Sequence, residues 1–393
     1  MNICVVGGAG KMAEAAIRDL MESDEVDEIV LADLNKTKLT VREQELHSTK
    51  IVTVTVDVTD IDALAKVLEP CDVVINCSLA YFNEGVMEAS LKANTHYTDM
   101  GGLFHWAKKQ LAMDERFRAA SLTAVCGSGS APGIVNVMAR HAYLRLDTVE
   151  FVRITDGIAN WATPVAPLVP PYSLDTILNE FLMNAWAFEN GALKEYAPFQ
   201  GAEEVDFPDP VGTQTCYYTI HSEPYTIPVA FKDKGIQECS FKLALPKEFE
   251  RKLRFLCDLG AASTEPLDVR GRPIVPREVV LELVERSLQE AKGRAPAGLD
   301  DHKVLRVDVR GTKDGQPQDW RMESVLHFYS PWNMPCSTFT VGFPAAVTAR
   351  LLGRGVIERR GAFGSEACIP TETYFAELNK RGIHVSAMQN IVY

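Results

Sequence analysis

The chain has 393 residues, of which 46% are hydrophobic and 24% charged. These values are typical of a folded globular protein of about two domains. Its formal net charge of -13 at pH 7 would repel a phosphate backbone, so we expect no nucleic-acid partner. We expect no signal peptide and no membrane span either, because the first apolar stretch is short and no later one approaches the length that crosses a bilayer.

The cysteines and histidines indicate the compartment and the metal content. Nine cysteines are scattered along the chain without a C-x-x-C pair, which favours a reducing, cytoplasmic environment. The eight histidines show no H-E-x-x-H motif and no Cys/His cluster at ligand spacing. We therefore expect no bound metal.

The first third of the chain alternates short β-branched runs with amphipathic helices, such as those predicted at 12–23 and 60–69. This alternation is typical of a parallel sheet covered on both faces. It predicts an α/β fold that begins with a doubly wound Rossmann domain. The strands are expected at 2–6, 28–33, 51–57, 72–76, 96–99 and 122–126.

From about residue 148 the strands become longer and carry polar residues at alternate positions, and Asp314-Gly315 indicates a hairpin turn. This pattern predicts an α+β domain with a mainly antiparallel sheet that has one solvated face. The Pro-rich segment 163–173 is interpreted as a connection or lid. A homodimer is expected, because the open face or edge of such a sheet needs covering. Helices are predicted at 173–190, 247–258 and 276–291, and again from about 338.

A glycine-rich turn follows the first strand directly. Gly8 and Gly10, with Ala13, fit G-x-G-x-x-A at the start of a helix, where backbone N–H groups can bind a pyrophosphate. The second strand ends in Asp33, whose carboxylate can accept hydrogen bonds from an adenosine ribose. The alternative is a glycine turn in a nucleotide-free domain, which would leave Asp33 unexplained.

Asp33 also bears on the choice of nicotinamide cofactor. A carboxylate at that position would repel the 2'-phosphate of NADP, so NAD is favoured. NADP stays possible, because Lys36 and Lys38 follow closely and could reach a phosphate.

Several longer segments carry a resemblance to a known family. They are VVGGAGKMAEAAIRDL, DVVINCSLAYFNEGVMEASLKANTHYTDMGG, CGSGSAPGIVNVMA, HSEPYTIP and LLGRGVIERRGAFGSEACIPTETYFAELNKRGI. In these segments the chain resembles the saccharopine dehydrogenase-like family, and within it the lysine 6-dehydrogenase (lysine ε-dehydrogenase) branch. One departure is Gly129-Ser130-Ala131-Pro132-Gly133, where saccharopine reductases have G-L-D-P-G, which weakens a saccharopine interpretation.

The resemblance implies a domain plan and a reaction. Residues 1–133 would form the Rossmann dinucleotide-binding domain, joined by a returning segment 338–393, and 134–337 would form a substrate-binding and dimerisation domain. Members of the family are NAD(P)-dependent and act on a C–N bond. In the lysine branch the ε-amine of L-lysine is oxidatively deaminated to 2-aminoadipate 6-semialdehyde. The alternatives are a saccharopine or carboxynorspermidine dehydrogenase, and a non-catalytic NAD-binding sensor.

The chemistry defines which side chains the site needs. Hydride leaves a nitrogen-bearing carbon only when the nitrogen is neutral, so a proton acceptor is required, and the carboxylate of an amino-acid substrate needs a cation or backbone N–H groups. For the most part each candidate also has a plain structural interpretation, as a turn, a packed side chain or a solvated charge. The catalytic candidates are Asp99, Tyr81, His221, Glu223 and Cys126.

Two further sets complete the predicted site, and Asp156 and Trp161 are weaker pocket candidates. Cofactor contacts are predicted for Gly8, Gly10, Lys11, Met12, Asp33, Asp57, Asn76, Cys77 and Ser78. Substrate contacts are predicted for Gly127, Pro132, Gly133, Arg153 and Lys242.

Overall fold

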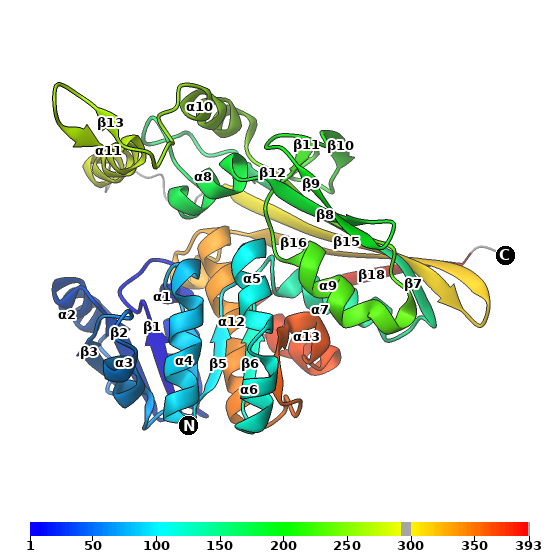
Figure 1. The fold of residues 1–393 in the computed structure, drawn as a ribbon, viewed down its shortest axis with the longest axis horizontal. Coiled ribbons are helices and arrows are strands. Elements are labelled where there is room, and N and C mark those ends of the chain that lie inside the picture. Colours follow the sequence, from blue (N-terminus) through cyan, green and yellow to red (C-terminus); the bar gives the residue numbers. More distant parts are fainter. Residues whose placement is uncertain (292–299, 392–393) are drawn as a thin grey trace.

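The computed structural model describes residues 1–291 and 300–391, which form two sheets with helices packed on them (Figure 1). The first sheet has seven parallel strands in the order β17-β6-β5-β4-β1-β2-β3. They are β1 (Asn2–Val6), β2 (Glu28–Asp33), β3 (Ile51–Thr55), β4 (Val73–Asn76), β5 (His96–Asp99), β6 (Thr123–Cys126) and β17 (Gly361–Gly364). Strands β1, β2, β4 and β6 are nearly continuous apolar runs, as expected of parallel strands buried on both faces.

The helices around this sheet confirm the predicted doubly wound Rossmann domain. Helix α12 comes from the C-terminal part of the chain and packs beside α1, where a Cβ at Gly342 would lie 2.7 Å from the carbonyl oxygen of Met12. In the described part of the chain, no helix has both the length and the hydropathy to cross a membrane. The helices are α1 (Ala13–Glu22), α2 (Lys36–Leu46), α3 (Ile61–Leu68), η1 (Ala80–Phe82), α4 (Asn83–Ala93), α5 (Phe104–Leu111), α6 (Asp114–Ala119) and α12 (Cys336–Gly353).

The second sheet is mixed and mainly antiparallel, as predicted, with β12 and β7 as its one described parallel pair. Its main path runs β10-β11-β12-β7-β15-β16-β18, and β8 and β9 branch from β12. The hairpin predicted at Asp314-Gly315 joins β15 to β16, and both residues have positive φ. The strands are β7 (Thr148–Asn160), β8 (Ala185–Glu189), β9 (Ala192–Tyr196), β10 (Glu203–Asp206), β11 (Thr213–Tyr218), β12 (Glu238–Ala244), β15 (Asp301–Lys313), β16 (Gln316–His327) and β18 (Ser386–Ile391).

Two expectations need correction here. The helix predicted at 173–190 ends at Leu182, because 185–189 instead pair with β9 as strand β8. The returning C-terminal segment contributes α12 and β17 to the first domain, but its last strand, β18, pairs with β16 of the second sheet. The remaining elements are α7 (Ile134–Tyr143), α8 (Leu174–Leu182), α9 (Glu223–Phe231), η2 (Lys232–Lys234), α10 (Lys247–Asp258), β13 (Leu267–Asp268), β14 (Pro273–Ile274), α11 (Pro276–Glu290), η3 (Ser330–Trp332), η4 (Ser365–Ala367) and α13 (Thr371–Asn379).

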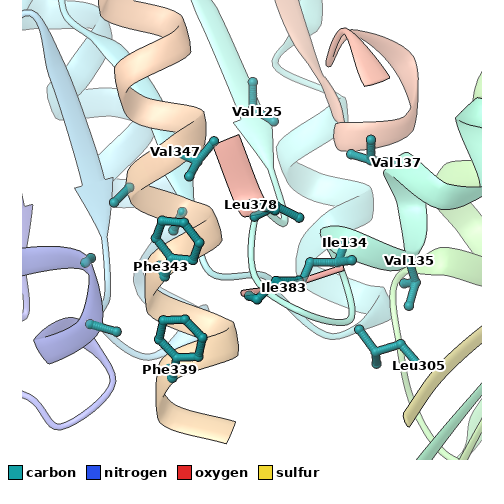
Figure 2. Close-up of a cluster of buried hydrophobic side chains, with 14 of the residues drawn as sticks. Val125, Ile134, Val135, Val137, Leu305, Phe339, Phe343, Val347, Leu378 and Ile383 are labelled. Carbon is teal, nitrogen blue, oxygen red and sulfur yellow. The ribbon is translucent and has the colours of Figure 1, made fainter. Parts of the chain in front are cut away.

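One hydrophobic core joins the two sheets (Figure 2). It combines Val125 of β6 and Phe343 of α12 with Val135 of α7, Leu305 of β15 and Leu378 of α13, all fully buried. Because buried apolar side chains pack at nearly crystalline density, this core holds the two sheets in a fixed relation. The space between them therefore has a defined shape.

The other face of the second sheet is charged. Its cations are paired within the chain, as in Arg153–Glu238 (2.9 Å) and Arg310–Asp319 (2.6 Å). Such pairs are typical of a solvated surface. The homodimer, which was expected to cover this face or the sheet edge, stays a prediction.

A buried ion network fixes α1, on which the glycine turn depends. Asp19 of α1 accepts from Arg350 of α12 (3.1 Å) and from Arg381, which follows α13 (2.8 Å). Arg350 also donates to Glu377 of α13 (3.0 Å). The network links three helices that lie far apart in the sequence.

We expect Asp19→Ala to destabilise the protein by about 3 kcal/mol or more, because it removes the buried carboxylate that Arg350 and Arg381 share and leaves part of each guanidinium group unpaired. The matched control is Asp62→Ala, which breaks the exposed Lys92–Asp62 pair (2.6 Å) and should cost less than about 1 kcal/mol. Urea unfolding measures both. Equal small losses would contradict the structural role of the network.

Candidate active site

A cavity of about 200 Å³ lies between the carboxyl ends of the parallel strands and the second sheet. Its floor comes from the loops after β1, β4, β5 and β6, and its roof from β7, β12, β15 and α8 with the segment before it. Ligands of doubly wound sheets bind at this end of the strands. The lining residues are Met12, Cys77, Ser78, Leu79, Ala80, Met100, Gly101, Gly102, Leu103, Ser130, Ala131, Pro132, Asp156, Tyr172, Ser173, Thr176, Glu180, His221, Leu243, Lys303, Ser337 and Val341.

The glycine turn after β1 fits a dinucleotide. A Cβ at Gly8 would lie 3.0 Å from the carbonyl oxygen of Val5, and one at Gly10 would lie 3.0 Å from that of Gly7. No side chain caps the N-terminus of α1, so its backbone N–H groups and the exposed Lys11 are available to phosphates.

Asp33 lies beside this turn at the end of β2. Its Oδ2 accepts from the backbone N–H of Ala9 (3.1 Å) and its Oδ1 from that of Asn35 (2.9 Å). A carboxylate oxygen can accept more than one hydrogen bond, so Asp33 can also receive a ribose hydroxyl. Asp57, the other predicted acidic contact, binds the backbone N–H (2.8 Å) and hydroxyl (2.7 Å) of Thr59 in a local turn after β3.

The loop after β4 is shaped by Asn76. Its Oδ1 accepts from the backbone N–H (3.1 Å) and the hydroxyl (2.6 Å) of Ser78, and its Nδ2 donates to Asn83 (2.9 Å). Asn76 is buried outside the lining, whereas Cys77 and Ser78 face the cavity. Burial raises the pKa of the Cys77 thiol, so this side chain lines the cavity in its uncharged form.

Asp99 is a structural anchor beneath the cavity, and the geometry does not support its predicted role as a base. Its two oxygens accept from Tyr97 (2.8 Å), Gln110 (2.6 Å) and the backbone N–H groups of Gly101 (2.8 Å) and Gly127 (2.7 Å). Burial raises the pKa of Asp99, although these four hydrogen bonds oppose the rise. A carboxylate enclosed by four donors has no lone pair directed at a substrate.

Three other predicted residues also lie outside the lining. Tyr81 is 53% exposed beside Phe82 on η1, and Trp161 is 60% exposed. Cys126 is buried at the end of β6, and burial raises the pKa of its thiol well above the usual value. A buried thiol with a raised pKa is a poor nucleophile, so Cys126 packs rather than reacts.

In the loop after β6, two glycines determine the backbone conformation, and the small residues between them form one wall of the cavity. Gly127 and Gly133 have φ of 81° and 137°, and a Cβ at Gly133 would lie 2.0 Å from the carbonyl oxygen of Gly129. Pro132, Ala131 and Ser130 line the cavity. Of the substrate contacts predicted in this loop, Pro132 therefore lines the cavity, whereas Gly127 and Gly133 lie outside the lining.

Arg153 and Lys242 lie on the wrong face of the second sheet for the predicted substrate contact. They pair with Glu238 (2.9 Å) and Glu203 (2.5 Å) on the open face. Successive residues of a strand point to opposite faces, and Asp156 and Leu243, at odd separations from them, face the cavity. The sequence identified the right strands but could not identify the buried face.

His221 lies in the cavity between two carboxylates. Its Nε2 is 3.5 Å from Glu180 and its Nδ1 is 3.3 Å from Glu223, and its ring stacks on Phe241 with centroids 3.6 Å apart. Burial lowers the pKa of His221, but Glu223 and Glu180 outweigh this effect and raise the pKa to about 9. Tyr172 donates to the other oxygen of Glu180.

Glu223 lies behind His221, outside the lining. The carboxylate of this cluster that faces the cavity is that of Glu180, which sequence analysis missed. His221 and Glu223 were both predicted catalytic candidates, and the structure places the two in contact.

A second charged pair faces the same cavity. Lys303 of β15 bonds Oδ2 of Asp156 on β7 at 2.7 Å, and both residues are at least 95% buried. Within the described residues, Asp156 Oδ1, Ser130 Oγ and Ser337 Oγ have no hydrogen-bond partner. Sequence analysis missed Lys303, Ser130, Ser337, Glu180 and Tyr172. Strand alternation was the available signal for Lys303. It lies an odd number of residues from Arg306 on the same strand, and Arg306 points to the open face, so Lys303 points to the cavity.

The fold and the cavity define a nicotinamide-dependent oxidoreductase, and comparison with known families identifies the family to which it belongs. Residues 3–125 match the family model described as saccharopine dehydrogenase NADP binding domain, and 129–383 match the saccharopine dehydrogenase C-terminal domain. The chain therefore belongs to the saccharopine dehydrogenase family and is an NAD(P)-dependent enzyme. A bound nicotinamide would accept or donate hydride.

Two curated relatives match over most of their length. Carboxyaminopropylagmatine dehydrogenase from Synechocystis sp. is 21% identical, over 96% of this chain and 96% of the relative. Carboxynorspermidine synthase from Vibrio cholerae is 24% identical, over 94% of this chain and 93% of the relative.

Two solved structures share the fold. Saccharopine dehydrogenase (L-Glu forming) from Saccharomyces cerevisiae matches with a TM-score of 0.72 and 16% identity, over 99% of both chains. Homospermidine synthase from Legionella pneumophila, solved in complex with NAD, matches with a TM-score of 0.69 and 11% identity, over 99% of this chain and 91% of that one.

We expect Asp33→Ser to weaken NAD binding and to narrow the preference for NAD over NADP, because it removes both a ribose acceptor and a charge that repels the 2'-phosphate. Fluorescence titration with both cofactors measures the change. Asp24→Ser, on the exposed surface, is the control. If both affinities of the Asp33 variant match the wild type, Asp33 does not contact the ribose.

Proposed function

We propose that the protein oxidises a distal C–N bond of an α-amino acid that carries one carboxylate, and that the ε-amine of L-lysine is its first candidate substrate. The observation that supports this is the charge of the cavity. Among the lining residues that the structure describes, Lys303 is the single lysine or arginine, and it lies beside the carboxylate of Asp156. The other cationic group, His221, already lies between the carboxylates Glu180 and Glu223. This set complements one carboxylate and one or more amines.

The same charge count argues against saccharopine as the substrate. Saccharopine carries more than one carboxylate, and each would need a cation or a set of N–H groups in a buried site. Ala131 stands where saccharopine reductases have an acidic residue. The L-lysine assignment itself is supported by the resemblance of the sequence segments to the lysine 6-dehydrogenase branch.

The Glu180–His221 pair is suited to accept the proton of the amine. His221 is a cation at neutral pH, because Glu223 and Glu180 outweigh the effect of burial and raise its pKa to about 9. Above that pH it is neutral and can share a proton that Glu180 takes from the substrate. Tyr172 holds Glu180 in place by donating to its second oxygen.

A second candidate is a carboxylated polyamine, in which a secondary amine replaces the primary ε-amine. The names of the Synechocystis and Vibrio relatives favour it. Oxidation of L-lysine would release ammonia and a semialdehyde, whereas oxidation of a carboxylated polyamine would release a semialdehyde and a diamine. The cavity charge fits both, since each has one carboxylate.

An assay at the reduced-nicotinamide absorbance band tests the proposal. L-lysine, saccharopine, L-ornithine and carboxynorspermidine are compared, each with NAD and NADP, and the released ammonia or diamine is quantified. We expect turnover with L-lysine and NAD. Turnover with carboxynorspermidine alone would select the second candidate. Tight NAD binding without amine-dependent reduction would contradict both and indicate a sensor.

We expect kcat/KM of the wild type to rise with pH through about 9, because His221 of the free enzyme must lose its proton before the pair can accept another. His221→Gln should lower kcat by about 10²- to 10⁴-fold and remove this inflection, leaving only the rise due to the free substrate amine. His105→Gln, on the exposed side of α5, is the matched control. An unchanged pH profile in His221→Gln would contradict the role of the pair.

A further inference from the structure

The Lys303–Asp156 pair differs from the other charged groups of the cavity in being incompletely satisfied. Lys303 uses one donor on Asp156 at 2.7 Å, and an ammonium has three donors. Asp156 Oδ1 has no partner among the described residues, although Asp156 is only 3% exposed. By contrast, Glu180 is held by Tyr172 and His221.

Two hydroxyls in the same cavity are also unsatisfied. Ser130 and Ser337 are each 1% exposed, and their Oγ atoms have no hydrogen-bond partner within the described ranges. Buried polar groups in native proteins are nearly always paired, and each unpaired one costs about 1–3 kcal/mol. Three such atoms around one cavity are therefore available to the polar groups of a ligand.

We propose that Lys303 and Asp156 together bind the α-amino-acid head group of the substrate, Lys303 taking the α-carboxylate and Asp156 Oδ1 the α-ammonium. A buried cation beside a buried anion is electrostatically complementary to a zwitterion, so each charge of the head group would meet a side chain of opposite charge. The hydroxyls of Ser130 and Ser337 can complete its hydrogen bonds. This inference rests on the proposed function and specifies the substrate class that both candidates share.

A purely structural salt bridge is the competing explanation. A buried pair whose only role is structural is costly unless further hydrogen bonds satisfy its remaining atoms, and here one carboxylate oxygen is left open toward a cavity. Burial raises the pKa of Asp156, and Lys303 opposes the rise. A ligand ammonium would supply the second positive partner that Asp156 lacks.

The assignment separates two regions of the cavity. The Lys303–Asp156 pair would bind the end of the substrate that does not react, and Glu180 with His221 would act at the reacting nitrogen. The substrate class is thus an α-amino acid with an amine on its side chain. A diamine without the carboxylate, or a lysine with a blocked α-amine, should bind poorly.

L-norleucine tests the clamp independently of turnover, because it keeps the lysine head group and chain but lacks the ε-amine. Calorimetry with the NAD-bound enzyme should show L-norleucine binding, with affinity about 10- to 100-fold weaker for Nα-acetyl-L-norleucine and for pentylamine, the range for losing a hydrogen bond to a charged group. These comparisons use the wild-type protein, so they do not depend on variant folding. Equal affinity for all three ligands, or no binding of L-norleucine, would overturn the proposal.

Variants then assign each charge. Lys303→Met and Asp156→Asn should each weaken L-norleucine binding by about 10- to 100-fold, and Asp156→Asn should abolish the discrimination against the acetylated ligand. Lys242→Met is the matched control on the open face and should bind like the wild type. L-norleucine binding that is unchanged in both cavity variants would overturn the clamp.

Turnover separates the two proposals. If L-norleucine binding follows the pattern above but no amine is oxidised, the proposed function fails and the clamp stands. If L-lysine is oxidised but KM is unchanged in Asp156→Asn and Lys303→Met, the proposed function stands and the clamp fails.

Discussion

The shape of the active site depends on the buried carboxylate of Asp99. Its four hydrogen bonds join the loop after β5, through Gly101, to the loop after β6, through Gly127, and to Gln110 of α5. Each hydrogen bond to a charged group is worth about 1.5–3 kcal/mol, so this one side chain holds the cavity floor rigidly. A residue in the position expected of a base thus acts by fixing the loops that face the substrate.

The charge of the cavity follows from the alternation of two long strands. Asp156 on β7 and Lys303 on β15 point inward, whereas Arg153 and Arg306 on the same strands point to the open face. The cavity lies between the two sheets, so its carboxylates and its lysine come from the second sheet and α8, and the glycine turn that would bind the cofactor belongs to the first sheet. The shared hydrophobic core holds the two sheets in a fixed position relative to each other (Figure 2).

Sequence reasoning recovered the local features and missed those that depend on tertiary pairing. The six N-terminal strands, the glycine turn and the hairpin at Asp314-Gly315 have signals in neighbouring residues. Strand β17 has four residues, two of them glycine, and forms only because β6 presents an open edge. Residues 185–189 have a helix-compatible composition but pair with β9. Strand alternation puts Lys303 on the opposite face from Arg306, but the sequence does not show which face lines the cavity. Glu180 could not be placed at all, because its neighbours in space are distant in sequence.

We infer that a single cavity joins the glycine turn, the Glu180–His221 pair and the Lys303–Asp156 pair. A crystal structure of the protein with NAD and L-norleucine tests it most directly. We expect the norleucine carboxylate within hydrogen-bond distance of Lys303 Nζ, its ammonium on Asp156 Oδ1, and its side chain directed toward Glu180. Norleucine bound on the open face beside Arg153 and Lys242, or in the cavity with its head group reversed, would contradict it.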